Sequence, residues 1–567
     1  MTIVLTFSMM VSLVPNSIIA QDPIYGGTLF TPMGSDIDTL NMFTQGTTYS
    51  SYILDHIYDS LVKYDVDNVP QPILCTAWEY DVTGEIWTFT LREGIVWHDG
   101  TPFTADDVIF TWEMLLADDT IPRRSWIYDW IDGFTKIDET HVSVDFSYAP
   151  GYADVMIDFA TGYIVPEHIW DTVDVHTFTN DAAIGCGPFK LAEYEPAQFF
   201  RFEAHTEYHL DGPYVAEKVV QIVRETEAGY YALSTGALDI LDGAPPDLVD
   251  VAMVDPAIEK HEWLQDYWMY LGLNQRIYPM NIKEFRQAVL YGINRSEIVD
   301  LARYGRGLTC PASASLPYGE YYNPDVRDYQ FNVALANSML DDLGFLDSIG
   351  DDGIREDANG TDLAFEVMVS AEAQESVDTA SLIAGYMADI GIDVTVKPVL
   401  FDVLWHEIGG DGSQLYNYEW CLLGWVGFWS DIHPNWASWL FNANGNWGGD
   451  SKNIPGWSGD PRANVTALCE EIFLTNDEDE KKDLLDQIQV IVAEDLPYLP
   501  LNILGGVTLY RVDEFKGWIM GSTTGPDNWE SWLSIQLIEP ESGPGFLALG
   551  AFLTIVVVVG LVRKRRR

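Results

Sequence analysis

The segment "TFTLREGIVWHDGTPFTADDVIFTWE" at residues 88–113 decides the fold, because it predicts a strand, a turn and the start of a helix in one short stretch. In its first part apolar residues alternate with polar ones, the two-residue period of a half-buried strand. Gly100 follows an aspartate, which is typical of a turn. Thr104 and Asp107 have the spacing of a capping box, so we expect a helix to begin there.

The same segment contains His98 beside Asp99, which could form a catalytic dyad. Adjacent side chains do not readily point at each other, and no nucleophile paired with a base lies nearby in the sequence. We therefore interpret the pair as part of a structural turn rather than as a catalytic site.

The length and composition are those of a folded protein with two or more domains. The 567 residues exceed the size of a single core. They are 47% hydrophobic and include 20 Trp and 29 Tyr, enough to fill large cores. Lys and Arg total 30 against 87 Asp and Glu, and the formal net charge of −57 excludes a nucleic-acid partner.

The five cysteines lie far apart, without the paired spacing of a zinc site. We expect buried free thiols, no metal centre and no cofactor. The acidic loop at 346–362 does not fit an EF-hand, because taking Gly353 as the loop glycine puts Asn359 where the bidentate glutamate belongs.

Both ends of the chain carry targeting patterns. Residues 1–20 are apolar and end in a small residue, as in a secretory signal peptide. Residues 546–562 form an uncharged run that would span about 25 Å as a helix, at the short limit for a transmembrane anchor. The basic tail at 563–567 would remain in the cytoplasm, so the body faces outward.

Between the ends, strand and helix patterns are mixed, which predicts an α/β body. Strands are expected at 140–146, 267–274 and 362–369, and helices at 283–293 and 481–495.

These motifs together resemble the extracellular solute-binding proteins of the peptide/nickel type (family 5), the receptors of ABC importers. The resemblance begins in the opening segment and continues in order through the body. The further matching motifs are "IDTLN" (37–41), "YIVPEHIW" (163–170), "GCGPFKL" (185–191), "YALSTGALDI" (231–240), "LGLNQ" (271–275), "FRQAVLYGINRSEIV" (285–299) and "DLPYLPL" (495–501). The C-terminal "GPGF" (543–546) before the apolar run also resembles the PGF-type sorting signal of archaeal surface proteins.

The resemblance implies a two-lobed, periplasmic-binding-protein-like fold of type II in its large, cluster-C form, with an extra subdomain inserted in lobe I. The lobes are expected to close over a ligand. The implied parts are lobe I (24–66, 185–273 and 498–535), the inserted subdomain (67–184), lobe II (274–497) and a linker (536–545) before the anchor. The chain would cross between lobes near residues 273–274 and 495–497.

The family position that lines the ligand cleft falls in "CLLGWVGFWSDIHPNW" (421–436). Trp425 and Trp429 could provide apolar walls, and Asp431 could hold a ligand's amino group, as the corresponding Asp does in peptide-binding members. Asp431 departs from the family spacing, and buried aromatic residues with a capping Asp are the alternative interpretation.

A second candidate is "IPRRSWIYDW" (121–130). The guanidiniums of Arg123 and Arg124 suit a carboxylate, and Trp126 and Tyr128 could stack on a ligand. The alternative is a surface arginine pair that neutralises nearby aspartates.

A third, weaker candidate is the pair Ser35 and Asp36, which matches the family position where lobe I touches the ligand.

The resemblance implies a binding protein rather than an enzyme. Its expected partners are a peptide and the permease subunits of an ABC importer, and we expect a monomer anchored on the outer face of the membrane. Alternatives in the same fold are a receptor for oligosaccharides or for a nickel chelate. A secreted glycosidase, from another functional class, would need two carboxylates about 5 to 9 Å apart, and no motif singles out such a pair.

Overall fold

A computed structural model describes residues 23–538, except 153, 316, 318–320, 348–351, 411–412, 414, 427–439, 442–452, 476 and 522–523. The expected signal peptide (1–20), anchor (546–562) and basic tail (563–567) lie outside the described residues. Within the described part, no helix combines the length and the apolar character needed to cross a bilayer.

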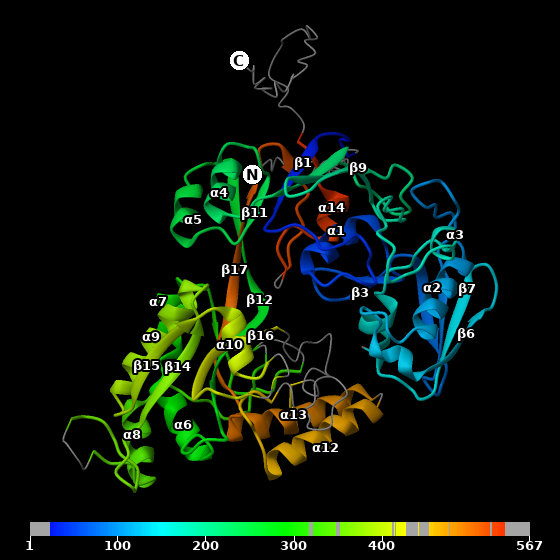
Figure 1. Cartoon of the computed structure of the whole chain (residues 1–567). Helices are drawn as coiled ribbons and strands as arrows, with labels where there is room; N and C mark the ends of the chain where they lie inside the picture. Colours follow the sequence, from blue (N-terminus) through cyan, green and yellow to red (C-terminus); the bar gives the residue numbers. More distant parts are fainter. Residues whose placement is uncertain are drawn as a thin grey trace, which may run out of the picture.

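Two long strands run through the centre of the molecule. β12 (Ile258–Leu273) and β17 (Leu499–Arg511) pair in antiparallel fashion and join the upper and lower halves in Figure 1. They belong to a sheet of order β11-β17-β12-β16-β14-β15, in which β13 also pairs with β17. Its other strands are β11 (Ile240–Asp242), β13 (Gly307–Thr309), β14 (Ala364–Ser370), β15 (Asp393–Val399) and β16 (Trp420–Val426).

The hydrophobic cores of the two halves divide along this strand pair. Val507 on β17 packs in the upper half with helices α4 and α5, whereas Leu504 packs against a lower core. Gly505 and Gly506 lie between them, opposite Leu264 and Trp263 of β12, and the strand register shifts directly after Leu264. The two halves are therefore joined by continuous strands that carry no shared core at this level.

The upper half contains a four-stranded sheet of order β1-β10-β9-β8, flanked by short helices. Its elements are β1 (Thr28–Met33), α1 (Thr48–Ile57), β8 (Phe189–Glu195), β9 (Phe199–Ala204), β10 (Glu217–Ile222), α4 (Thr226–Ser234), α5 (Pro246–Ala252), β18 (Phe515–Lys516), α14 (Trp529–Ser534) and β19 (Gln536–Leu537).

The segment expected as an inserted subdomain forms a second four-stranded sheet of order β4-β5-β7-β6 beside the first (Figure 1). Its elements, with the small hairpin that leads into it, are β2 (Val62–Tyr64), β3 (Pro70–Pro72), β4 (Cys75–Tyr80), β5 (Ile86–Leu91), α2 (Ala105–Ala117), η1 (Trp126–Trp130), β6 (Ile131–Lys136), β7 (His141–Phe146), η2 (Asp154–Ala160) and α3 (Glu167–Trp170).

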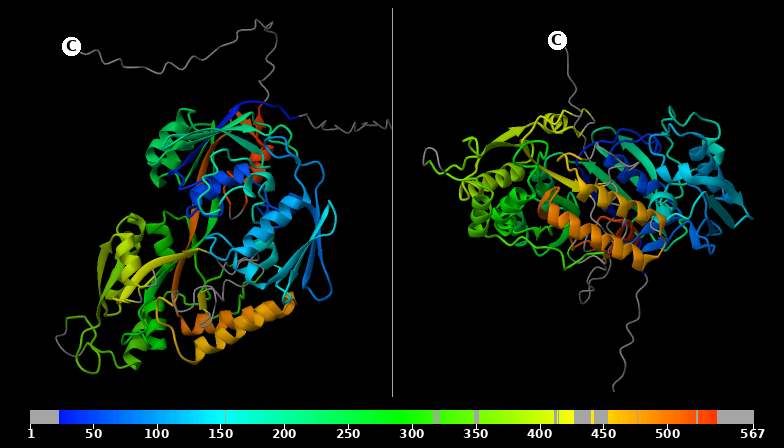
Figure 2. Two further views of the ribbon diagram at one scale, coloured as in Figure 1. Left: turned by 45° about the vertical axis from the view of Figure 1, so that its right-hand side comes forward. Right: turned by 90° about the horizontal axis from the view of Figure 1, so that it is seen from below.

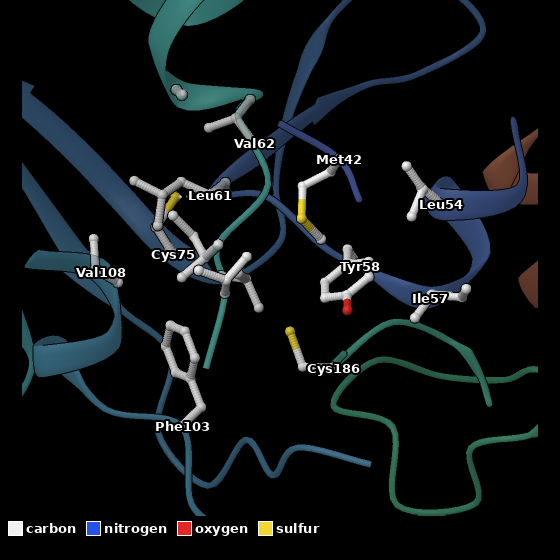
Figure 3. Packing of buried hydrophobic residues seen from close by; sticks show 14 of the residues in the cluster. Met42, Leu54, Ile57, Tyr58, Leu61, Val62, Cys75, Phe103, Val108 and Cys186 are labelled. Carbon is white, nitrogen blue, oxygen red and sulfur yellow. Dashed lines mark hydrogen bonds between the residues drawn. The ribbon is translucent and has the colours of Figure 1, made fainter. Parts of the chain in front are cut away.

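These two sheets share one hydrophobic core rather than two. Met42 and Tyr58 of lobe I belong to the same buried cluster as Cys75, Phe103 and Val108 of the inserted subdomain, as Figure 3 shows. Because close-packed interiors resist shear, the two parts form one body.

The lower half packs helices on both faces of the central sheet (Figure 2). Alternate residues of β12 face opposite sides, with Trp268 and Tyr270 in one core and Met269 and Leu271 in the other. The helices are α6 (Lys283–Gly292), α7 (Arg295–Ala302), α8 (Val333–Asp342), α9 (Gln374–Ala388), α10 (Phe401–Glu407), α12 (Asp460–Leu474) and α13 (Glu478–Asp495).

The elements expected from the sequence are confirmed. The three predicted strands fall in β7, β12 and β14, and the two predicted helices are α6 and α13. All five cysteines are free and buried.

The opening segment is a structural frame, as expected. The Nδ1 atom of His98 accepts a hydrogen bond from the Gly185 N–H (3.3 Å), and its Nε2–H donates to the Gly187 carbonyl (3.0 Å). Burial lowers the pKa of His98 to about 3, which keeps the ring neutral in this role. Asp99 contacts His168 rather than its neighbour (2.9 Å).

The capping box of α2 also ties this helix to α3. Asp107 accepts hydrogen bonds from the Thr104 N–H (2.8 Å) and from the Glu167 N–H (2.9 Å), and it is only 5% exposed. We expect Asp107→Ala to reduce the free energy of unfolding by about 1–3 kcal/mol, because two backbone donors lose their buried acceptor. Chemical denaturation measures this loss.

Asp106→Ala is the matched control one residue away. Asp106 is exposed and pairs with Lys136 at the surface (2.8 Å), so its removal should cost less than about 1 kcal/mol. Equal losses for the two variants would contradict the role given to Asp107.

Candidate ligand-binding site

A pocket of about 640 Å³ lies between lobe I and the inserted subdomain, a volume suited to a small ligand. Three chain segments line it, drawn from residues 42–51, 111–128 and 157–164. Arg123, Arg124 and Tyr128, three of the residues expected to bind ligand, are among its lining residues.

The two arginines differ in what they contact. Arg124 donates to the Leu115 carbonyl (2.7 Å), pairs with Asp129 (2.7 Å) and lies 5.6 Å from the centre of the Tyr128 ring. Arg123 is exposed, and only its backbone N–H is engaged, by the Phe43 carbonyl (3.1 Å). Across the described residues the Arg123 guanidinium has no ion-pair partner, so it is the cation available to an anionic group.

Tyr128 does not provide the open stacking face that was expected of it. Tyr128 is 4% exposed, packs against Phe134 and Phe159, and has its pKa raised by burial. It is therefore a core residue that closes the pocket rather than an open stacking face. Trp126 lies in η1, and its side chain is outside the described part.

Of the first candidate segment, residues 421–436, the structure describes only residues 421–426. Trp429 and Asp431 lie outside the described residues. Trp425 is 7% exposed, with Tyr270 stacked on it (6.2 Å between ring centres) and Trp405 edge-on (6.1 Å). It is a core residue of lobe II, so any contact with a ligand is limited to its edge.

The described part of this segment ends close to the boundary between the two halves. β16 ends at Val426, which pairs with Tyr267 of β12. The strand shift between Leu264 and Trp268 lies next to this pair, near the boundary between the upper and lower cores.

Asp36 stabilises the fold of lobe I. Its carboxylate accepts hydrogen bonds from the Tyr194 hydroxyl (2.9 Å), the Ala197 N–H (2.7 Å) and the Ile37 N–H (2.9 Å). Both oxygens are used to hold the β8–β9 hairpin. Ser35 beside it is half-buried.

A second pocket, of about 340 Å³, adjoins the first and was not expected from the sequence. Its lining residues are Tyr52, Asp55, Ser60, Lys63, Tyr64, Thr161, Tyr163, Asp527, Asn528, Trp529 and Trp532. Thr161 and Tyr163 also line the larger pocket. Asp55 is the residue missed by sequence reasoning: it stands in an ordinary amphipathic helix, and its contact with Tyr163 joins positions 108 residues apart.

The described residues contain no group of three or more His, Cys, Asp or Glu side chains that could hold a metal ion. The arrangement present is one of aromatic walls, an exposed arginine and a half-buried carboxylate.

Two lobes joined by a strand pair, with a ligand-sized pocket in the upper half, define a solute-binding protein. The chain belongs to the bacterial extracellular solute-binding proteins of family 5: the model described as "Bacterial extracellular solute-binding proteins, family 5 Middle" matches residues 69–447.

Particular relatives are similar over most of the chain. The oligopeptide-binding protein AppA of Bacillus subtilis is 24% identical over 415 residues, covering 72% of this chain and 75% of that protein. The dipeptide-binding protein of Escherichia coli is 25% identical over 511 residues, covering 84% and 89%. The solved structure of Bacillus subtilis AppA in complex with a nonapeptide is similar in fold, with a TM-score of 0.72, 21% identity and coverage of 91% of this chain and 100% of that one.

The burial of Trp425 predicts the outcome of its removal. Trp425→Ala should lower the free energy of unfolding by about 3–5 kcal/mol, the scale of a large aromatic residue removed from a core. A melting curve measures this. A variant that melts like the parent would contradict the core position and return Trp425 to the open wall of a cleft.

Proposed function

We propose that this protein is the extracellular receptor of an ABC importer, which captures oligopeptides or dipeptides between two closing lobes and delivers them to permease subunits in the membrane. The family and the names of the relatives support a peptide ligand. The single observation that carries the proposal is Arg123, an exposed guanidinium without an ion-pair partner across the described residues, on the rim of a pocket with aromatic walls. A peptide supplies the carboxylate that such a group binds.

Lobe closure in this proposal bends the strand pair at Gly505 and Gly506. These two glycines separate Leu504, which packs against the lower core, from Val507, which packs in the upper core. Trp429 and Asp431, which follow β16 in the sequence, are proposed to meet the ligand from lobe II, with Asp431 holding a ligand cation or hydroxyl.

A thermal-shift comparison on the full-length protein in detergent tests the ligand class. Synthetic peptides of two to nine residues should raise the melting temperature, because a ligand that binds only the folded state stabilises it. Mannose oligosaccharides and a nickel–histidine chelate, tested in parallel, should not. A shift with either of these and none with peptides would contradict the proposal.

In the same assay, Arg123→Gln should weaken binding of the active peptides by about tenfold or more, the scale of a lost charge-assisted hydrogen bond. Arg224→Gln is the matched control, since Arg224 is exposed on lobe I and lines neither pocket.

We further propose that the mature protein acts as a monomer on the outer face of the cell membrane. Residues 1–20 would direct export, and residues 546–562 would anchor it as a transmembrane or lipid-replaced segment. Deletion of residues 543–567 should then release the protein into the medium, which immunoblotting of cell and medium fractions measures. Continued retention in the cell fraction would count against the anchor.

A further inference from the structure

The sequence contains three Asn-X-Ser/Thr triplets, the acceptor motif for an N-linked oligosaccharide. They are "NRS" (294–296), "NGT" (359–361) and "NVT" (464–466). A transferase that modifies the folded protein must reach both the amide of the asparagine and the hydroxyl of the third residue. All three triplets lie in the described part of the chain, and they differ in how far these two groups are exposed.

The first triplet begins at the N-cap of a helix. Asn294 precedes α7, and its side-chain oxygen accepts a hydrogen bond from the Glu297 N–H (3.2 Å), while its Nδ2 donates to the Glu297 carboxylate (3.0 Å). The middle residue, Arg295, is 7% exposed and donates to the Cys310 carbonyl (2.6 Å). Because both ends of the Asn294 amide are engaged, an oligosaccharide at this position would disturb the helix cap.

The third triplet lies inside a helix. Asn464 and Thr466 both belong to α12, where Asn464 is exposed but Thr466 is only 6% exposed. Residues two apart in a helix do not share a face, so the amide and the hydroxyl point to different sides. A transferase cannot meet both groups of this triplet in the folded protein.

The second triplet forms the exposed tip of a tight loop. Asn359, Gly360 and Thr361 are all exposed. The Asp357 N–H donates to the Thr361 carbonyl (2.8 Å), and the Asp357 carboxylate accepts from the N–H groups of Asn359 (2.7 Å) and Thr361 (2.9 Å). Gly360 has a φ of +78°, which glycine adopts without strain. The Nδ2 atom of Asn359 makes one long hydrogen bond, to Asp357 (3.3 Å), which leaves its second N–H for reaction.

The base of this loop is fixed to lobe II, so the tip projects from a rigid support. Arg355 donates to the Asp341 carboxylate (2.6 Å) and to the Asn337 side-chain oxygen (2.8 Å), both on α8. Arg355 also donates to the Ile390 carbonyl (2.9 Å), and Glu356 beside it is 2% exposed. α8 lies at the lower left end of lobe II in Figure 1, away from the upper half that contains both ligand pockets. An oligosaccharide on the tip would therefore extend into solvent and leave both pockets open.

We propose that Asn359 carries an N-linked oligosaccharide, attached by an oligosaccharyltransferase on the outer side of the membrane. The donor is an oligosaccharide linked to a polyprenyl phosphate or diphosphate. The Nδ2 atom of Asn359 forms a bond to the anomeric carbon of the donor, the bond from that carbon to the phosphate oxygen breaks, and the lipid phosphate leaves. Nδ2 gives up one proton to a base of the transferase, and nothing is oxidised or reduced. The inference requires only that the body of the protein faces outward, so it is independent of the peptide ligand.

The test is mass spectrometry of the full-length protein isolated from the membranes of the organism that encodes it. Peptides that contain Asn359 should carry the added mass of an oligosaccharide, whereas peptides that contain Asn294 or Asn464 should have their unmodified masses. Tagged variants made in the same organism locate the linkage. Asn359→Gln and Thr361→Ala should lose the added mass, and Thr361→Ser should keep it because the hydroxyl remains.

The matched controls remove the other two triplets. Ser296→Ala and Asn464→Gln should leave the added mass unchanged, and a melting curve checks that every variant is folded. An unmodified Asn359 in the parent, an oligosaccharide on Asn294 or Asn464 instead, or an added mass that persists in Asn359→Gln would each overturn the inference. A glycosylated Asn359 in a protein that binds no peptide would support the inference and contradict the proposed receptor function alone.

Discussion

The pairing of β12 with β17 is the constraint on which the rest of the molecule depends. These strands pass from one half to the other without a break in the chain, so every other element is attached to one end of them or the other. At Gly505 and Gly506 the pair passes from the lower half, where Leu504 and Leu264 pack, to the upper half, where Val507 packs. The strand pair therefore lies along the line where the two halves meet.

The second organising feature is the common core of lobe I and the inserted subdomain. Residues such as Tyr58 and Phe103 come from different segments but pack in one cluster, so both pockets are lined by parts of a single rigid body. The two pockets beside α1 are consequently formed within one body. Next to them Asp59 pairs with Lys63, and Asp129 pairs with Arg124.

Sequence reasoning was reliable where local pattern decides structure and unreliable where distant contacts do. The capping box at Thr104 and the alternation in β12 could be predicted because each depends on neighbouring residues. The roles of Asp36, Tyr128 and Trp425 depend on burial and on partners elsewhere in the chain, which a single sequence does not reveal. The expected lobe crossings near 273–274 and 495–497 stay a prediction; they lie at the lower ends of β12 and β17.

Lobe I is built from segments that lie far apart in the sequence, and this limits the order in which it can fold. Leu29 packs in the same cluster as Trp532 and Ile535, and Phe515 pairs with Leu537, so the first strand acquires its full surroundings only when the last elements of the body exist. Lobe II, by contrast, draws most of its elements from one continuous stretch of chain. During synthesis, residues 24–66 therefore complete their packing only once residues 515–537 have been made, near the end of the body.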